Sequence, residues 1–97
     1  MIKYYVIATD FENKRLFLDK TGKTSKYIEE TSSWEYSPRK EEIKKLYGKG
    51  WEYLEKIEVI KEVVYNNDII RYADKVFKGG EKLVWYINVQ KIWVNQI

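Results

Sequence analysis

The first residues of the chain constrain its fold more than any other segment. Ile2 to Thr9 are mostly β-branched or aromatic, and apolar side chains occupy both odd and even positions after Lys3. Successive side chains of a strand point to opposite faces of a sheet, so this pattern is typical of a strand that is covered on both sides. We therefore expect residues 2–9 to form a central strand of a β-sheet.

Three further strands are expected in the first two thirds of the chain. Arg15 to Asp19 follows a polar turn, and residues 26–30 follow a second turn that contains Gly22. The run from Ile57 to Tyr65 is rich in Val and Ile, which favour strands. The first three strands would follow one another as a meander.

A short helix is predicted from Ser37 to Tyr47. Serine at the N-cap and Pro38 at the first helical position are a favoured start, and two glutamates follow in the first turns. Gly48 suits the position just past the end of a helix. The helix would be amphipathic, with one apolar stripe.

The last third of the chain contains two further segments with regularly spaced apolar residues. Residues 68–78 carry apolar side chains at helical spacing, which predicts a second helix ending at Gly79 and Gly80, with a strand as the alternative. A long last strand is expected over residues 82–95, with a bulge or bend near 88–91 where the apolar residues change parity. Together the elements predict a single α+β domain over residues 1–97. It would consist of an antiparallel β-sheet of four to five strands with one or two short helices.

Composition argues against an enzyme. The chain has no Cys and no His, which leaves no thiol nucleophile, imidazole base or Cys/His zinc site. No glycine-rich phosphate loop is present, and the glutamate clusters are more typical of a solvated surface than of a metal site. We expect no catalytic residues, no cofactor and no metal.

Charge and hydropathy place few limits on the partner. The net charge is +3, and the sign alternates in blocks along the chain. No apolar run is long enough to cross a membrane, and the N-terminus does not resemble a signal peptide. We expect a cytoplasmic protein with no membrane partner.

Aromatic residues are the positive feature of the sequence. Four Trp, nine Tyr and three Phe are more than a domain of this size can bury, and exposed Trp and Tyr are frequent at binding hot spots. The residues expected at the surface lie in polar segments or after the bend, and they are Trp34, Tyr36, Trp51, Tyr53 and Trp93.

Basic residues follow the first two of these aromatics. Arg39, Lys40, Lys44 and Lys45 would belong to the predicted helix. Aromatic and basic side chains together suit either stacking on single-stranded nucleic acid or docking onto an acidic protein surface. We therefore predict a contact surface around residues 34–45, with residues 51–53 and Trp93 as second choices.

Residues 3–64 resemble small orphan proteins of bacteriophages and other mobile elements. The resemblance is carried by an initial strand with Lys3-Tyr4-Tyr5-Val6-Ile7, a loop with Ser33-Trp34-Glu35-Tyr36, a Lys/Glu helix from Ser37 to Tyr47 and a Val/Ile strand. It implies a host-takeover or anti-defence protein, such as an anti-CRISPR inhibitor. Such a protein acts stoichiometrically in the cytoplasm of the host cell.

Three functions remain open on the sequence. The first is an inhibitor that binds a host protein, such as a component of a nucleic-acid-handling complex. The second is a domain that binds single-stranded nucleic acid through the aromatic loop and the Lys-rich helix. The third is a homodimeric structural or assembly protein that pairs through an edge strand.

Overall fold

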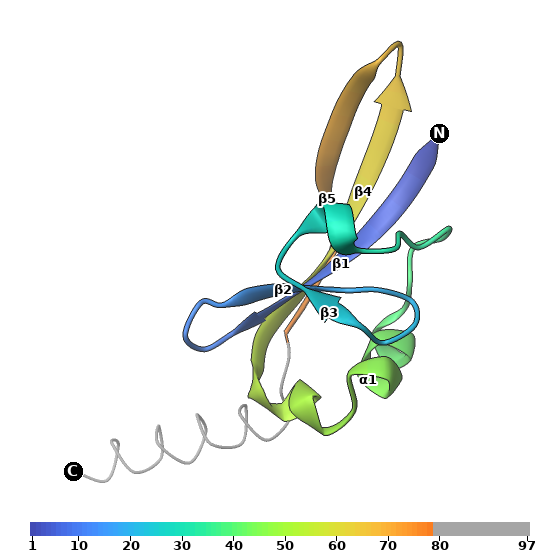
Figure 1. Cartoon of the computed structure of the whole chain (residues 1–97). Helices are drawn as coiled ribbons and strands as arrows, with labels where there is room; N and C mark the ends of the chain where they lie inside the picture. The colour runs from blue at the N-terminus through green and yellow to red at the C-terminus, as the bar shows by residue number, and fades with distance from the viewer. Residues whose placement is uncertain (79–97) are drawn as a thin grey trace, which may run out of the picture.

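A five-stranded antiparallel sheet organises residues 1–78, the part of the chain that the computed structural model describes. The strand order is β3-β2-β1-β4-β5 (Figure 1). The strands are β1 (Ile2–Asp10), β2 (Arg15–Leu18), β3 (Thr24–Ser25), β4 (Leu54–Tyr65) and β5 (Asp68–Lys78). One α-helix, α1 (Lys40–Tyr47), and two 3₁₀ segments, η1 (Ile28–Glu30) and η2 (Gly48–Tyr53), complete the fold. The predicted α+β class and strand number are confirmed.

The first strand is central, as its sequence predicts. Val6 pairs with Leu18 of β2 on one side and with Val59 of β4 on the other. Residues 5–9 are all buried, so both faces of β1 are covered along this stretch. This burial on both faces explains why apolar residues occupy both odd and even positions of β1.

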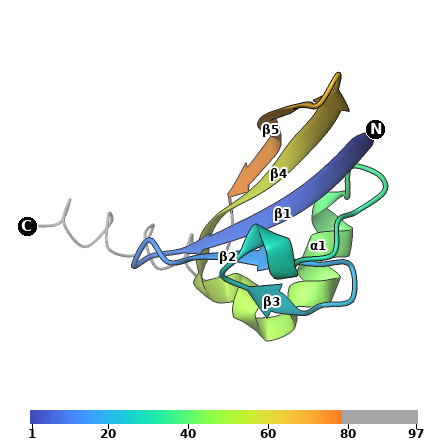
Figure 2. The same cartoon turned by 45° about the horizontal axis from the view of Figure 1, so that its top comes forward.

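The core lies on one face of the sheet, which we call the inner face. Even-numbered residues of β1 point toward it, as do Leu54, Ile57 and Val59 of β4, and Ile43 of α1 packs against them, completely buried. Figure 2 shows α1 behind the sheet and η1 in front of it. We call the face opposite α1 the outer face. The inner-face core consists of Val6, Ala8, Leu18, Trp34, Ile43, Trp51, Leu54, Ile57 and Val59.

The helix begins later than the sequence predicts. Its N-cap is Arg39, and Glu42 closes a capping box by accepting a hydrogen bond from the Arg39 backbone N–H at 3.3 Å. The Ser37 hydroxyl instead donates to Asp74 Oδ2 of β5 at 2.6 Å. A tertiary contact has therefore taken the side chain that the sequence assigns to the cap. The end of the helix is confirmed, since Gly48 is its C-cap with φ of 69°.

The predicted strand at residues 26–30 is wrong. The third strand is the shorter β3, and η1 occupies residues 28–30. Ser25 explains the difference, because its hydroxyl accepts a hydrogen bond from the Tyr27 N–H and donates to Glu30, both at 3.1 Å. These local bonds stabilise a turn instead of continued strand pairing.

The predicted helix at residues 68–78 is also wrong, and the strand alternative is correct. Asn66 and Asn67 have φ of 49° and 67°, the two positive values that a two-residue hairpin turn requires. β5 then pairs with β4 from Tyr65↔Asp68 to Lys56↔Lys78, with a bulge opposite Val59 and Ile60. The helical spacing of the apolar residues is a coincidence of a strand that has apolar side chains on both faces.

The strand expected at residues 82–95, with its bend, lies outside the described residues, as does Trp93. No helix within residues 1–78 is long and apolar enough to cross a membrane.

Candidate binding surfaces

Trp34 is a core residue and not a surface anchor, contrary to the sequence prediction. Its side chain is only 3% exposed, and its indole N–H donates to the Leu18 carbonyl at 3.2 Å. Its backbone forms a bridge with Tyr4, N–H to carbonyl, in both directions at 2.7 and 3.0 Å. The loop at Trp34 thus pairs with β1 along the same edge as β2. This pairing directs the indole into the core.

Trp51 is also buried, at 2% exposure, and it packs in the same core from η2. Its prediction as a surface anchor is wrong. Tyr53, two residues later, is 61% exposed as expected. The short 3₁₀ segment therefore turns one aromatic inward and the next outward.

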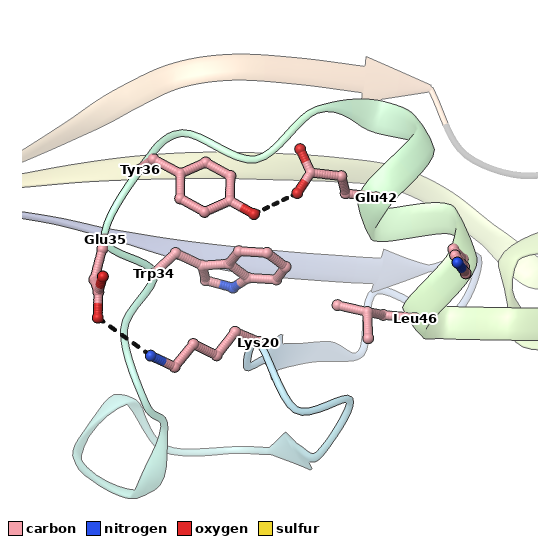
Figure 3. A pocket seen from close by; sticks show the side chains of 7 residues that line it. Lys20, Trp34, Glu35, Tyr36, Glu42 and Leu46 are labelled. Carbon is pink, nitrogen blue, oxygen red and sulfur yellow. Dashed lines mark hydrogen bonds and ion pairs between the residues drawn. The ribbon is translucent and has the colours of Figure 1, made fainter.

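The loop and helix that the sequence singles out form a pocket of about 500 Å³, which we call the loop–helix pocket (Figure 3). It lies between the loop after η1, the start of the turn after Leu18 and one side of α1. Its lining combines both charge signs with aromatic and aliphatic groups. The lining residues are Lys20, Trp34, Glu35, Tyr36, Glu42, Lys45 and Leu46.

Tyr36 is the exposed aromatic of this pocket, at 54%. Its hydroxyl donates to the Glu42 carboxylate, and its ring meets the Trp34 ring edge to face, with centroids 6.1 Å apart. The hydrogen bond from Tyr36, with smaller contributions from Arg39, holds the pKa of Glu42 below its usual value. The same bond raises the pKa of Tyr36. The side chain is thus held by α1 and by the core at once.

The charges of the pocket are largely paired. Lys20 Nζ lies 3.4 Å from Glu35 Oε1, and Arg39 Nε lies 3.3 Å from Glu42 Oε1. Lys45 lines the pocket, whereas Lys40 is exposed at the first turn of α1. Lys44, half-buried on the same helix, lies outside the pocket lining. The structure therefore brings together only part of the predicted basic patch, and with acidic groups beside it.

A second surface, missed by the sequence analysis, is the β4–β5 hairpin. Its exposed apolar side chains lie mainly on β5, where four large apolar residues are about half-exposed or more. They are Ile69 at 59%, Ile70 at 54%, Tyr72 at 48% and Val76 at 59%. Tyr65 at the turn and Ile2 beside it are exposed as well. The Asn66-Asn67 pair between two β-branched runs is the signal that could have revealed this hairpin.

An apolar groove of about 370 Å³ crosses the outer face of the sheet beside the hairpin. Tyr5 and Ile7 of β1, Ile60 of β4 and Ala73 of β5 line it, together with Ile28 of η1. Partial burial and then the nearby Glu62 raise the pKa of Tyr5.

Glu62 and Arg71 form an ion pair at the side of this groove. Arg71 Nε donates to Glu62 Oε2 at 2.7 Å, and the Glu62 side chain is only 7% exposed against 47% for Arg71. A carboxylate so poorly solvated requires a partner, and within residues 1–78 the guanidinium supplies it.

Among the described residues, no three acidic side chains group closely enough to hold a metal ion. Comparison of the chain with family models, with curated proteins and with solved structures finds no significant match. Residues 1–78 form a small α+β domain in which the loop–helix pocket carries both charge signs and the β4–β5 hairpin exposes apolar side chains.

Proposed function

We propose that this chain is a non-enzymatic protein that binds a single protein partner, with the β4–β5 hairpin as its contact surface. The observation that supports this is the concentration of exposed apolar side chains on β5. Isolated exposed apolar residues are normal, but neighbouring ones on one element mark interaction surfaces. Ile70 and Tyr72 are neighbours of this kind on one face of β5, and Ile69 is exposed on the opposite face beside them.

The charges of the hairpin favour a protein over a nucleic acid. Charges of both signs lie along β5, at Asp68, Arg71, Asp74, Lys75 and Lys78. Nucleic-acid surfaces are strongly positive, whereas protein interfaces combine apolar centres with polar rims of either sign. The hairpin has the second composition.

The resemblance of residues 3–64 to phage orphan proteins suggests the class of partner. It makes a defence protein of the host cell the proposed target and stoichiometric inhibition, as by anti-CRISPR proteins, the proposed mode of action. A nucleic-acid-handling complex is a target of this kind. Inhibition would then follow from occupying a functional surface of the target, with no chemical step.

The test is affinity capture from host lysate, with and without nuclease, by the wild type and by two sets of variants. Ile69→Asp and Ile70→Asp place a charge in the hairpin surface. Lys40→Ala and Lys45→Ala change the loop–helix surface and serve as controls. We expect nuclease to have no effect and each hairpin variant to lose about tenfold or more in affinity, which corresponds to about 1.4 kcal/mol.

The proposal is wrong if the hairpin variants capture the partner as well as wild type while the lysine variants do not. Circular dichroism must show the same fold in all four variants. All four positions are exposed, so the substitutions should leave the core intact.

Binding of single-stranded nucleic acid is the second candidate, and the exposed Arg39, Lys40 and Tyr36 at the start of α1 favour it. Burial of Trp34 and Trp51 removes two of the stacking platforms that this function would use. A salt titration with a labelled oligonucleotide tests it, since phosphate contacts make the logarithm of affinity fall steeply with the logarithm of salt. No binding at low salt would reject it.

A further inference from the structure

The inner face of the sheet continues along the hairpin past α1 (Figure 1). There the cross-strand partners Ile2, Val63 and Ile70 form one row of aliphatic side chains, which we call the aliphatic row. Ile2 and Ile70 are exposed, and Val63 is half-buried. Alternate residues of a strand share a face, so the rows on either side of it lie on the same face, about 7 Å away.

These two neighbouring rows carry opposite charges. Toward the core, Lys61 lies between its strand partners Tyr4 and Tyr72, and its Nζ is 5.9 Å from the centre of the Tyr72 ring. Toward the turn, Asp68 pairs with Tyr65. The aliphatic row therefore has an ammonium group on one side and a carboxylate on the other.

Within residues 1–78, neither Lys61 nor Asp68 forms an ion pair. Asp74, whose charge also acts on Lys61, accepts a hydrogen bond from the Ser37 hydroxyl at 2.6 Å. Lys61 is half-buried, so a carboxylate beside it is worth more than one beside a fully solvated lysine. The surface thus favours a partner that brings a carboxylate to Lys61 and apolar side chains to the aliphatic row.

The same surface has these features itself. A two-fold axis along the aliphatic row brings two copies face to face and places the Tyr65–Asp68 row of one copy over the Lys61 row of the other. Tyr65 then lies over Lys61, where a cation–π contact is favourable. Asp68 lies one strand spacing, about 4.8 Å, to the side, which a lysine side chain can span. The axis repeats both contacts, so each forms twice.

We propose that the chain forms a homodimer in which two hairpins pack face to face through this surface. The aliphatic rows of the two copies bury each other at the centre, and a Lys61–Asp68 ion pair lies on either side. The partner of the surface is thus a second copy of this chain. Two twisted sheets commonly pack in this way, with their strands inclined by about 30°.

The size of the contact sets the expected strength of the dimer. The three rows contain eight residues of each copy. Stable complexes bury about 20 to 30 residues on each side. We therefore expect a weak dimer, with a Kd between about 10 and 500 µM.

This inference goes beyond the proposed function and does not depend on it, because the dimer is measured with the purified chain alone. Ile69 lies on the outer face and stays accessible in the dimer. A host protein that binds at Ile70 has to displace the second copy.

Sedimentation equilibrium of the full chain from 10 µM to 1 mM tests the proposal. Ile70→Asp places a charge in the aliphatic row, and the control Ile69→Asp places the same charge at the neighbouring exposed isoleucine on the outer face. We expect Ile70→Asp to raise the Kd about tenfold or more and Ile69→Asp to change it less than about twofold. A wild-type chain that is still monomeric at 1 mM, or equal effects of the two variants, would overturn the proposal.

A charge exchange tests the predicted contact between Lys61 and Asp68. Lys61→Glu and Asp68→Lys each bring like charges together and should raise the Kd about fivefold or more. The double variant Lys61→Glu/Asp68→Lys exchanges the two charges and should return the Kd to within about twofold of wild type. A double variant that dimerises no better than the single ones would overturn the proposed arrangement.

Should the variants fold poorly, NMR of the wild-type chain gives the same decision. Methyl resonances of Ile2, Val63 and Ile70 should shift as the protein concentration rises, because these groups become buried, while those of Ile69 stay in place. Shifts at Ile69 as large as at Ile70, or no shift in the aliphatic row, would reject the dimer.

Discussion

The loop–helix pocket and the β4–β5 hairpin use aromatic and apolar residues in opposite ways. In the pocket, Trp34 lies at the centre of a polar loop and is nonetheless buried, whereas on β5 Ile69 and Ile70 lie in a regular strand and are exposed. The loop crosses the inner face, where it is the nearest cover for the core. The hairpin extends the sheet past α1, where little within residues 1–78 covers either face. Position relative to the layers, and not local hydrophobicity, therefore decides exposure.

The largest expected effect separates the two regions by stability. Trp34→Ala should lower the free energy of unfolding by about 3–5 kcal/mol, because it opens a cavity in the core. Tyr36→Ala, its exposed neighbour, is the control and should cost far less. Urea denaturation measures both. Similar losses for the two variants would contradict the inward orientation of Trp34.

A second prediction concerns the hairpin, whose stability depends on one poorly solvated charge. Arg71→Ala should lower the free energy of unfolding by about 2 kcal/mol, since it leaves the Glu62 carboxylate without its partner. The value is below the range for fully buried pairs because Arg71 is half-exposed. Urea denaturation measures it.

The matched control is the double variant Glu62→Gln/Arg71→Ala, which removes the charge as well. It should recover part of the stability that Arg71→Ala loses. If the double variant is less stable than the single one, desolvation of Glu62 is not the cause.

A third prediction concerns Asp19, which fixes the turn before the loop–helix pocket. Burial raises its pKa, but hydrogen bonds from Thr21 and Lys23 outweigh burial and hold the pKa below its usual value. A lowered pKa in the folded state contributes stability above the unfolded value of about 3.9, and this contribution is lost as the pH falls through the folded pKa.

Asp19→Asn should therefore lower the free energy of unfolding by about 1 kcal/mol at neutral pH. The difference from wild type should shrink as the pH falls below about 4. Urea denaturation at a series of pH values measures it. A difference that stays constant across this range would show that the carboxylate charge is not involved.

The smallest effect sharpens the picture of the pocket. Tyr36→Phe removes the hydroxyl that contributes most to the low pKa of Glu42. We expect this pKa to rise toward its ordinary value, with no change in fold. NMR titration of the Glu42 carboxyl measures it, and an unchanged pKa would mean that the hydrogen bond is not formed in solution.

Much of the fold could be predicted because local signals and the tertiary structure agree. β1 has apolar residues on both parities and is central, and Gly48 ends α1 where a left-handed residue is needed. The predictions failed where a distant partner intervened. Ser37 bonds to Asp74, thirty-seven residues away in sequence, so it does not cap the helix.

In the candidate site, too, some predictions from the sequence were correct and others failed. Tyr36 and Tyr53 were correctly expected at the surface, and Trp34 and Trp51 were not. All four lie in segments of similar polarity, so nothing local separates them. The hairpin was missed because the apolar residues of β5 fit helical spacing, although the Asn66-Asn67 turn was readable.

The sequence by itself determined the class of fold, the central position of β1 and the absence of Cys and His chemistry. These properties follow from residue type and local periodicity, which act over a few residues. Only the tertiary structure decided which aromatics are buried and which strand stands last in the sheet formed by residues 1–78. Those properties depend on how the loop and the helix pack against the sheet. Contacts such as the hydrogen bond from Trp34 to Leu18 join residues that are neighbours only in the folded chain.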